Sequence, residues 1–341
     1  MKQIGIFDES IRLEKISKLG DNLVALKKTI DWEKFRPIID RAIPIKNDSK
    51  KGGRPSFDHV MMFKILILQR LYNLSDDQME FQINDRISFM RFLDLSISDT
   101  IPDAKTIWKF REDLKNANVI RKLFQKFNYE LKKRGLIANE GSIIDATFVE
   151  VPRQRNTHEE NEKIKNGEVP EEWQKPENAA KLAQKDTDAR WTKKNNETFY
   201  GYKDSVLADA KSKLICDYSV TNAAVHDSLA CRTLLTSDIK SLYADSAYSG
   251  KEIAEILESL GIENHIHEKG YRNKPLTDEQ KESNKKKSKI RARIEHIFGF
   301  MTGAMHGITS RCIGMKRNEF NIGLTNLTYN MCRLVQLSAN C

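Results

Sequence analysis

This 341-residue chain contains an acidic residue, Asp145, inside an apolar segment, and it is the first candidate for a catalytic residue. Asp145 lies within Ser142–Val151, a run of β-branched and aromatic residues that predicts a strand covered on both faces. An ionised carboxylate in such a strand is costly unless a hydrogen-bonded partner or a metal ion compensates it. Asp145 alone therefore fits either a catalytic or a structural carboxylate, and the other acidic residues must decide.

Two further carboxylates occupy comparable positions. Asp245 ends a short apolar strand, and the carboxyl ends of strands are where ligands bind in open sheets. Glu295 lies beside the buried face of a helix predicted through residues 290–301. Two strand aspartates and a helix glutamate offer only hard oxygen ligands, which suits Mg²⁺ or Mn²⁺ and argues against zinc. Two such ions about 4 Å apart can drive an in-line phosphoryl displacement.

The elements that must position these carboxylates change type near residue 135. Residues 1–135 predict an all-helical domain, in which a capping box formed by Ser75 and Gln78 opens one helix and Gly135 closes the last. A Lys-Lys-Gly-Gly-Arg-Pro segment at 50–55 has the composition of a linker. The short helices suit either a helix-turn-helix-like DNA reader or a dimerisation module, and the sequence does not decide between them.

Residues 136–341 predict a second, α/β domain, with a mixed sheet flanked by helices. After the strand at 142–151, further strands are predicted at 198–208, 214–221, 241–245 and 263–267. Helices are predicted between them at 226–235 and 251–260. A polar insertion of about 152–197 separates the first two strands. A basic stretch at about 269–293 precedes the C-terminal helices.

Composition favours a polyanionic partner in a reducing compartment. The net charge is +9, and the five cysteines show no metal-ligand spacing. The first residues lack the apolar core of a signal peptide, and the apolar run Val60–Leu71 is too short to span a bilayer. These features predict a cytoplasmic protein with no membrane partner.

Six ordered motifs make the chain recognisable. They are Ile-Asp-Ala-Thr at 144–147, Asp-Ala-Arg-Trp-Thr-Lys-Lys at 188–194, Tyr-Gly-Tyr-Lys at 200–203, Val-His-Asp at 225–227, Tyr-Ala-Asp-Ser-Ala-Tyr at 243–248 and Arg-Ala-Arg-Ile-Glu-His-Ile-Phe-Gly at 291–299. Together they resemble bacterial insertion-sequence transposases of the DDE class, specifically the insertion-sequence-five family, whose catalytic core is RNase H-like. The helical region from Gly53 to about Leu114 also resembles that family's N-terminal domain.

The resemblance implies that Asp145, Asp245 and Glu295 form the catalytic triad and hold two Mg²⁺ or Mn²⁺ ions. It implies double-stranded DNA partners, namely terminal inverted repeats and target DNA, and a homo-oligomer on DNA in the bacterial nucleoid. Two positions depart from a related signature: Ser288 stands where that signature has Tyr, and Thr302 where it has Lys.

Seven residues are predicted to contact DNA: Arg291, Arg293, Lys289, Lys203, Lys194, Lys193 and Trp191. We expect Arg291 to hold the scissile phosphate, with an i, i+4 salt bridge to Glu295 as the structural alternative. Lys289 and Arg293 should contact flanking phosphates. Trp191 could stack on a displaced base, although anchoring the insertion to the sheet is the simpler interpretation. His226 and Asp227 are expected to open a helix, with Asp227 as its cap.

The leading hypothesis is a metal-dependent DNA transposase, an endonuclease that also joins the cleaved ends of its element to target DNA. One alternative is a structure-selective nuclease with the same fold and the same carboxylates. The other is a non-catalytic DNA-binding regulator, which the departures at Ser288 and Thr302 keep open.

Overall fold

The computed structural model describes residues 8–44, 56–138, 140–194, 196–272 and 274–339. The predicted linker at 50–55 therefore lies outside the described residues. The chain forms two compact units, one made of residues 1–126 with 327–341 and the other of residues 127–326. Two helices, α8 (Ile120–Lys133) and α16 (Met315–Ala339), cross the boundary between the units.

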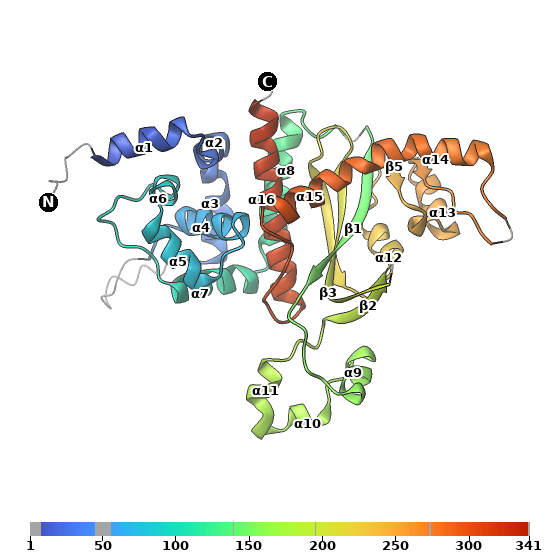
Figure 1. Ribbon diagram of the computed structural model, residues 1–341, viewed down its shortest axis with the longest axis horizontal. Coiled ribbons are helices and arrows are strands. Elements are labelled where there is room, and N and C mark those ends of the chain that lie inside the picture. Colours follow the sequence, from blue (N-terminus) through green and yellow to red (C-terminus); the bar gives the residue numbers. More distant parts are fainter. Residues whose placement is uncertain (1–7, 45–55, 139, 195, 273, 340–341) are drawn as a thin grey trace. The chain divides into compact units, whose positions relative to one another are not determined.

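The first unit is helical, as predicted (Figure 1). Its helices are α1 (Asp8–Lys18), α2 (Asn22–Thr29), η1 (Trp32–Phe35), α3 (Arg36–Ala42), α4 (His59–Leu71), α5 (Asp76–Asp85), α6 (Ile87–Leu93) and α7 (Ala104–Asn116). The apolar helix α4 forms the centre of the core, with Phe63 and Ile65 fully buried. The capping box of Ser75 and Gln78 opens α5, as predicted.

The second unit contains a six-stranded mixed sheet, which confirms the predicted fold class. Its strands are β1 (Ser142–Glu150), β2 (Arg190–Lys194), β3 (Glu197–Asp209), β4 (Ile215–Asn222), β5 (Ser241–Ala244) and β6 (Glu263–Ile266). The order is β2-β3-β1-β5-β6, with β4 also pairing β3. Strands β1 to β4 pair antiparallel, whereas β5 is parallel to both β1 and β6.

Helices cover both faces of this sheet. On one face, α12 (Asp227–Leu234) and α13 (Lys251–Ser259) pack against a buried cluster that includes Ile144, Leu207 and Leu242. On the other face, Ile322 of α16 packs against Val149 and Tyr202. The continuous apolar character of β1 thus results from cover on both sides.

A glycine fixes how closely β3 approaches β1. Gly201 lies opposite Glu150 with φ +147, a conformation that side chains rarely adopt. A Cβ atom at this position would collide with the carbonyl oxygen of Val149. The Tyr-Gly-Tyr-Lys segment therefore requires its glycine for steric reasons.

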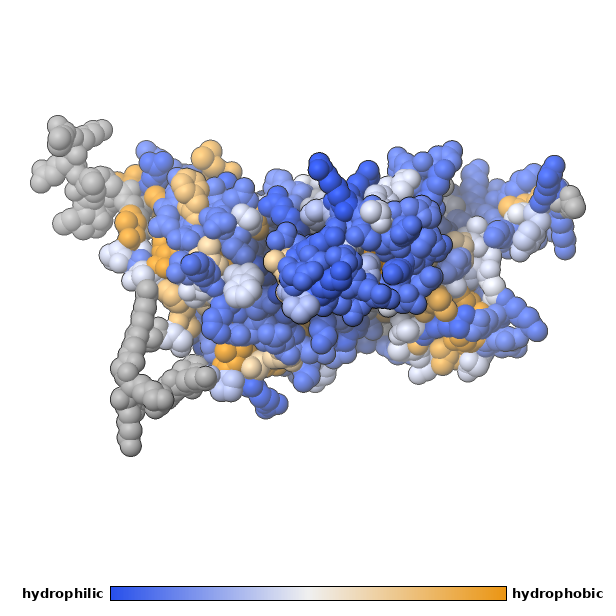
Figure 2. Space-filling view, turned by 90° about the horizontal axis from the view of Figure 1, so that it is seen from below, coloured by the Kyte–Doolittle hydropathy of each residue, from blue (hydrophilic) through white to orange (hydrophobic). Residues whose placement is uncertain are grey.

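The polar insertion predicted at about 152–197 contains three short helices and a strand, β2, that the sequence analysis did not predict. The three helices are α9 (His158–Lys165), α10 (Glu171–Gln174) and α11 (Ala179–Ala183), with the 3₁₀ turn η2 (Pro176–Asn178) between the last two. The helices lie beyond the end of the sheet that carries β2 (Figure 1). Figure 2 views the molecule from this side and shows a mostly hydrophilic surface.

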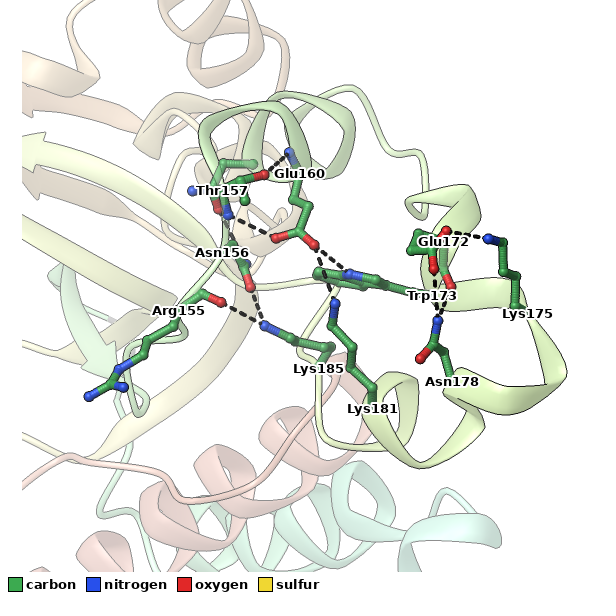
Figure 3. Close-up of polar contacts among 11 residues, drawn as sticks. Arg155, Asn156, Thr157, Glu160, Glu172, Trp173, Lys175, Asn178, Lys181 and Lys185 are labelled. Atoms are coloured by element: carbon green, nitrogen blue, oxygen red, sulfur yellow. Dashed lines mark hydrogen bonds and ion pairs between the residues drawn. The ribbon is translucent and has the colours of Figure 1, made fainter.

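The insertion has its own small core around Trp173, which is fully buried (Figure 3). The indole Nε1 donates a hydrogen bond of 2.7 Å to Glu160, and the ammonium group of Lys185 lies 4.9 Å from the ring centroid. Lys185 also donates to the carbonyl oxygen of Arg155 at 3.0 Å. A buried tryptophan with a satisfied N–H explains how so polar a segment is ordered.

The C-terminal half of the unit departs from the sequence prediction at one point. The helix expected to run unbroken through residues 290–301 is divided into α14 (Asp278–Arg291), the 3₁₀ turn η4 (Ala292–Ile294) and α15 (Glu295–Gly303).

No helix in the described ranges combines the length and the apolarity needed to cross a membrane.

Candidate active site

The two strand aspartates meet because of sheet register. In the parallel pair of β1 and β5, Ser142 lies opposite Leu242 and Ile143 opposite Tyr243. The same offset, 242 − 142 = 100, places Asp145 level with Asp245, which directly follows β5. Both carboxylates therefore lie at the carboxyl end of β5, the position expected for a ligand site.

Asp145 is a largely buried carboxylate, with a side chain 18% exposed. Its Oδ1 accepts a hydrogen bond of 2.8 Å from the N–H of Ala146, and its Oδ2 lies 3.3 Å from Nη1 of Arg291. Burial raises the pKa of Asp145, and the negative charge of Asp245 raises it further, against the N–H of Ala146 and the charge of Arg291. Burial and the charge of Asp245 thus outweigh the contacts of Asp145 with Ala146 and Arg291.

Asp245 is held by the turn that it caps. It precedes the 3₁₀ turn η3 (Ser246–Tyr248), and its Oδ1 accepts a hydrogen bond of 2.7 Å from the N–H of Ala247. Together with Asp145 it supplies hard oxygen ligands to one place, and their mutual repulsion is what a divalent cation would relieve. The donor set therefore fits Mg²⁺ or Mn²⁺.

Glu295 does not join this pair. It is the exposed first residue of α15, directly after η4. Across the described ranges, no group of three or more His, Cys, Asp or Glu side chains is arranged to hold a metal ion. The structure thus brings together two of the three predicted carboxylates.

The three basic residues before Glu295 have different surroundings. Arg291 forms its ion pair with Asp145, not the i, i+4 pair with Glu295 considered from the sequence. Lys289 is exposed on α14. Arg293 is also exposed, but it donates a hydrogen bond of 2.8 Å to the carbonyl oxygen of Ala210, in the turn between β3 and β4.

Lys203 is used inside the protein. Its side chain is buried, and its ammonium group donates to Oδ1 of Asp227 and to the carbonyl oxygen of Val225, both at 2.7 Å. A phosphate contact would have to break a buried ion pair, which is costly, so this lysine is not suited to the predicted role. The predicted helix cap is also corrected: His226, not Asp227, is the N-cap of α12.

The other three predicted DNA contacts lie on β2. Lys193 and Lys194 are exposed, and the side chain of Trp191 is 40% exposed. Trp191 packs against Tyr200 with ring centroids 4.8 Å apart, as expected for a residue that anchors β2 to the sheet. The guanidinium of Arg153 lies 5.6 Å from the Trp191 ring centroid, a contact that no sequence pattern indicates.

One residue near the site was not identified from the sequence. His267 follows β6 at the same end of the sheet as Asp245, and its Nε2 lies 3.3 Å from Oγ of Ser288. Burial lowers the pKa of His267, and the charges of Arg291 and Lys287 lower it further, against Asp245. Its position directly after a short strand, at the sheet edge where ligands bind, is the sequence feature that could have identified it as a site residue.

Two family models match this chain. Residues 11–113 match a family model described as "Transposase domain (DUF772)", and residues 138–331 match one described as "Transposase DDE domain". The chain is also similar to a solved structure titled "Cryo-EM structure of piggyBac transposase synaptic complex with hairpin DNA (SNHP)". That similarity has a TM-score of 0.46 at 12% identity and covers 94% of this chain and 76% of the other, and no argument rests on it.

Proposed function

The chain belongs to the transposase DDE domain family, and we propose that it cuts DNA at the ends of an insertion sequence and joins the 3′ ends to target DNA. The observation that carries this proposal is that the sheet register places Asp145 level with Asp245. Arg291 forms an ion pair with Asp145. In this proposal the two aspartates hold Mg²⁺ or Mn²⁺, and Glu295 completes the triad.

When bound, two such ions would activate a water or a 3′-hydroxyl and stabilise the leaving oxygen. The residues of the chain supply the positioning. The backbone pairing of β1 and β5 fixes the separation of Asp145 and Asp245 along the sheet edge. Arg291 already lies at this edge, within reach of an anionic phosphate.

Support for including Glu295 comes from its distance along the chain. It lies four residues after Arg291 (295 − 291), whose guanidinium contacts Asp145. Three of these four steps lie in the 3₁₀ turn η4 and together they rise about 7–8 Å, so the glutamate belongs to the segment that borders the site. Its role as third ligand rests on the family resemblance.

The exposed basic residues would hold the DNA around the site. Lys289 on α14 and Lys193 and Lys194 on β2 are placed in solvent, where they can neutralise phosphates. Each lost phosphate contact should reduce the magnitude of the negative slope of log K against log salt by about one unit. We expect a homo-oligomer on DNA, because joining two ends requires that both be held together.

The proposal is tested on a labelled terminal-repeat duplex with Mg²⁺. Asp145→Asn, Asp245→Asn and Glu295→Gln should each reduce cleavage at least about 100-fold while leaving DNA binding intact. Glu263→Gln, on β6 with a side chain 76% exposed, is the matched control and should cleave normally. Full activity in all three triad variants would refute the site.

Strand joining separates the transposase from the alternative of a structure-selective nuclease, which would cut without linking the released end to target DNA. The non-catalytic alternative draws on Ser288 and Thr302, whose hydroxyls donate to the backbone of their own helices, to Asn284 and Phe298. Wild-type protein that binds the duplex and never cuts it would favour that regulator.

A further inference from the structure

The ion pair between Arg291 and Asp145 uses little of what the arginine can offer. A guanidinium carries five N–H donors, and it binds a carboxylate most strongly through two parallel hydrogen bonds. Here one contact of 3.3 Å joins Nη1 of Arg291 to Oδ2 of Asp145. Nε of Arg291 is buried and has no hydrogen-bond partner within the described ranges. The guanidinium therefore keeps donor capacity that Asp145 does not use.

The backbone of Arg291 is held beside the site by other residues of α14. The side-chain amide of Asn284 donates to the carbonyl oxygen of Glu268 at 3.1 Å. The ammonium group of Lys287 donates to the carbonyl oxygen of Ile266, the last residue of β6, also at 3.1 Å. Arg291 is the last residue of this helix and takes no part in either contact. Its side chain can thus leave the carboxylate without α14 leaving the sheet.

Both ligands of the proposed site would break the same ion pair. Asp145 can bind a metal ion fully only when its carboxylate gives up the guanidinium as its counter-charge. Arg291 can bind a phosphate fully only when its guanidinium gives up the carboxylate. Whichever ligand binds first therefore bears the cost of breaking the pair, and the second ligand does not, which is the condition for positive coupling.

We propose that the ion pair of Arg291 and Asp145 couples DNA binding to metal binding, because each ligand frees the residue that the other one needs. This inference rests on the proposed function, since it assigns the regulation of that same site. The coupling is reciprocal, and one partly exposed ion pair corresponds to a factor of about ten in each affinity. The metal site is then fully available only when DNA is present.

The competing explanation is a fixed structural ion pair that persists whatever is bound. In that case the loss of the Asp145 charge would affect DNA binding only as the loss of any nearby negative charge does. Asp245 provides the matched comparison, because it lies level with Asp145 at the same sheet edge, whereas the ion pair of Arg291 is made with Asp145.

The first experiment measures binding of a labelled terminal-repeat duplex to the full-length protein by fluorescence anisotropy in EDTA. Without metal, DNA affinity reports on the ion pair alone. Asp145→Asn should bind the duplex about tenfold more tightly than wild type, and Asp245→Asn about two- to threefold, the effect of removing one nearby charge. In an Arg291→Gln background, which keeps the exposed lysines of α14 and β2, Asp145→Asn should gain no more than Asp245→Asn.

A second experiment measures Mn²⁺ binding by calorimetry in the absence of DNA, and it keeps the test decisive if Asp145→Asn folds poorly. Arg291→Gln should bind Mn²⁺ about tenfold more tightly than wild type, because Asp145 no longer has an internal counter-charge. Lys287→Gln is the matched control. It removes the same charge one turn earlier in α14, from a side chain that contacts Ile266, and should change the Mn²⁺ affinity less than about threefold.

Equal gains in DNA affinity for Asp145→Asn and Asp245→Asn would overturn the coupling. So would a Mn²⁺ affinity in Arg291→Gln no higher than that in Lys287→Gln. Either result leaves the proposed function standing as long as the wild type still cleaves the duplex with Mg²⁺. Normal cleavage by Asp145→Asn with Mg²⁺ would instead overturn the proposed function itself, which distinguishes the two failures.

Discussion

Replacing Asp204 with asparagine should stabilise the protein, and the gain should be largest above neutral pH. Asp204 is fully buried on β3, and its Oδ1 accepts a hydrogen bond of 3.1 Å from the side-chain amide of Asn326. Its Oδ2 and Oδ1 of Asn326 are both without a partner in the described part of the chain. A proton on Asp204 could be donated to that amide oxygen and would satisfy both atoms at once. The amide of Asp204→Asn can make the same two hydrogen bonds at every pH.

The magnitude follows from the pKa. Burial raises the pKa of Asp204 from 3.8 to about 7, with Asn326 opposing the shift. Because the folded state holds this proton more tightly, its contribution to stability is complete below about pH 4. It is lost at about 1.4 kcal/mol per pH unit up to about pH 7, and stability is then level. The total is (7 − 3.8) × 1.36, or about 4 kcal/mol.

The assay is urea unfolding of wild type and Asp204→Asn at pH 5 and pH 8. The variant should be more stable by about 4 kcal/mol at pH 8 and by about 2 kcal/mol at pH 5, because only the wild type titrates. Parallel pH dependences in the two proteins would refute the reasoning.

Asp186→Asn is the matched control for this comparison. The carboxylate of Asp186 accepts hydrogen bonds from the N–H groups of Asp188, Ala189 and Gly314 and from the hydroxyl of Tyr202. An amide there would turn an N–H towards these donors. This variant should lose stability at both pH values.

Three further predictions concern the site, the sheet and the insertion. Arg291→Gln removes the positive charge beside Asp145, so the pKa of Asp145 should rise further. Single-turnover cleavage at saturating enzyme should therefore fall most at low pH, and an unchanged dependence of the rate on pH would exclude Arg291 from the site. Gly201→Ala should cost about 3 kcal/mol or more in urea unfolding because of the Val149 carbonyl, whereas Gly299→Ala, with open space around it, should be neutral or slightly stabilising. Trp173→Ala removes the buried side chain at the centre of the insertion and should destabilise this segment by about 3–5 kcal/mol. Limited proteolysis of the variant should then cut first within residues 152–188, and a variant as resistant as the wild type would contradict this prediction.

The parts of the fold predicted correctly are those with local signals. The β-branched run around Asp145 indicated β1, and the capping box at Ser75 marked the start of α5. The meeting of Asp145 and Asp245 is consistent with a general rule, because neighbouring parallel strands end at the same sheet edge. In each case the residues that determine the structure lie close together in the sequence or obey one topological constraint.

The parts that were missed depend on distant partners. Strand β2 reads Arg-Trp-Thr-Lys-Lys, which is too short and too charged to predict a strand, and it exists because its backbone pairs with β3. Lys203 has the sequence appearance of a surface lysine, yet its partner Asp227 lies 24 residues away, across a strand and a turn. Nothing in the residues adjacent to either element reports that pairing.

Glu295 illustrates why a helix residue is harder to place than a strand residue. The apolar positions Ile290, Ile294 and Ile297 keep helical spacing through η4, so the sequence pattern does not reveal the 3₁₀ turn. A 3₁₀ turn advances about 120° per residue and an α-helix about 100°, so three residues of η4 rotate Glu295 by roughly 60° from the stripe expected with Arg291. That rotation separates the two residues: Arg291 turns to Asp145, and Glu295 is exposed. The aspartates are fixed by the sheet, whereas the direction of the third carboxylate depends on a single three-residue turn.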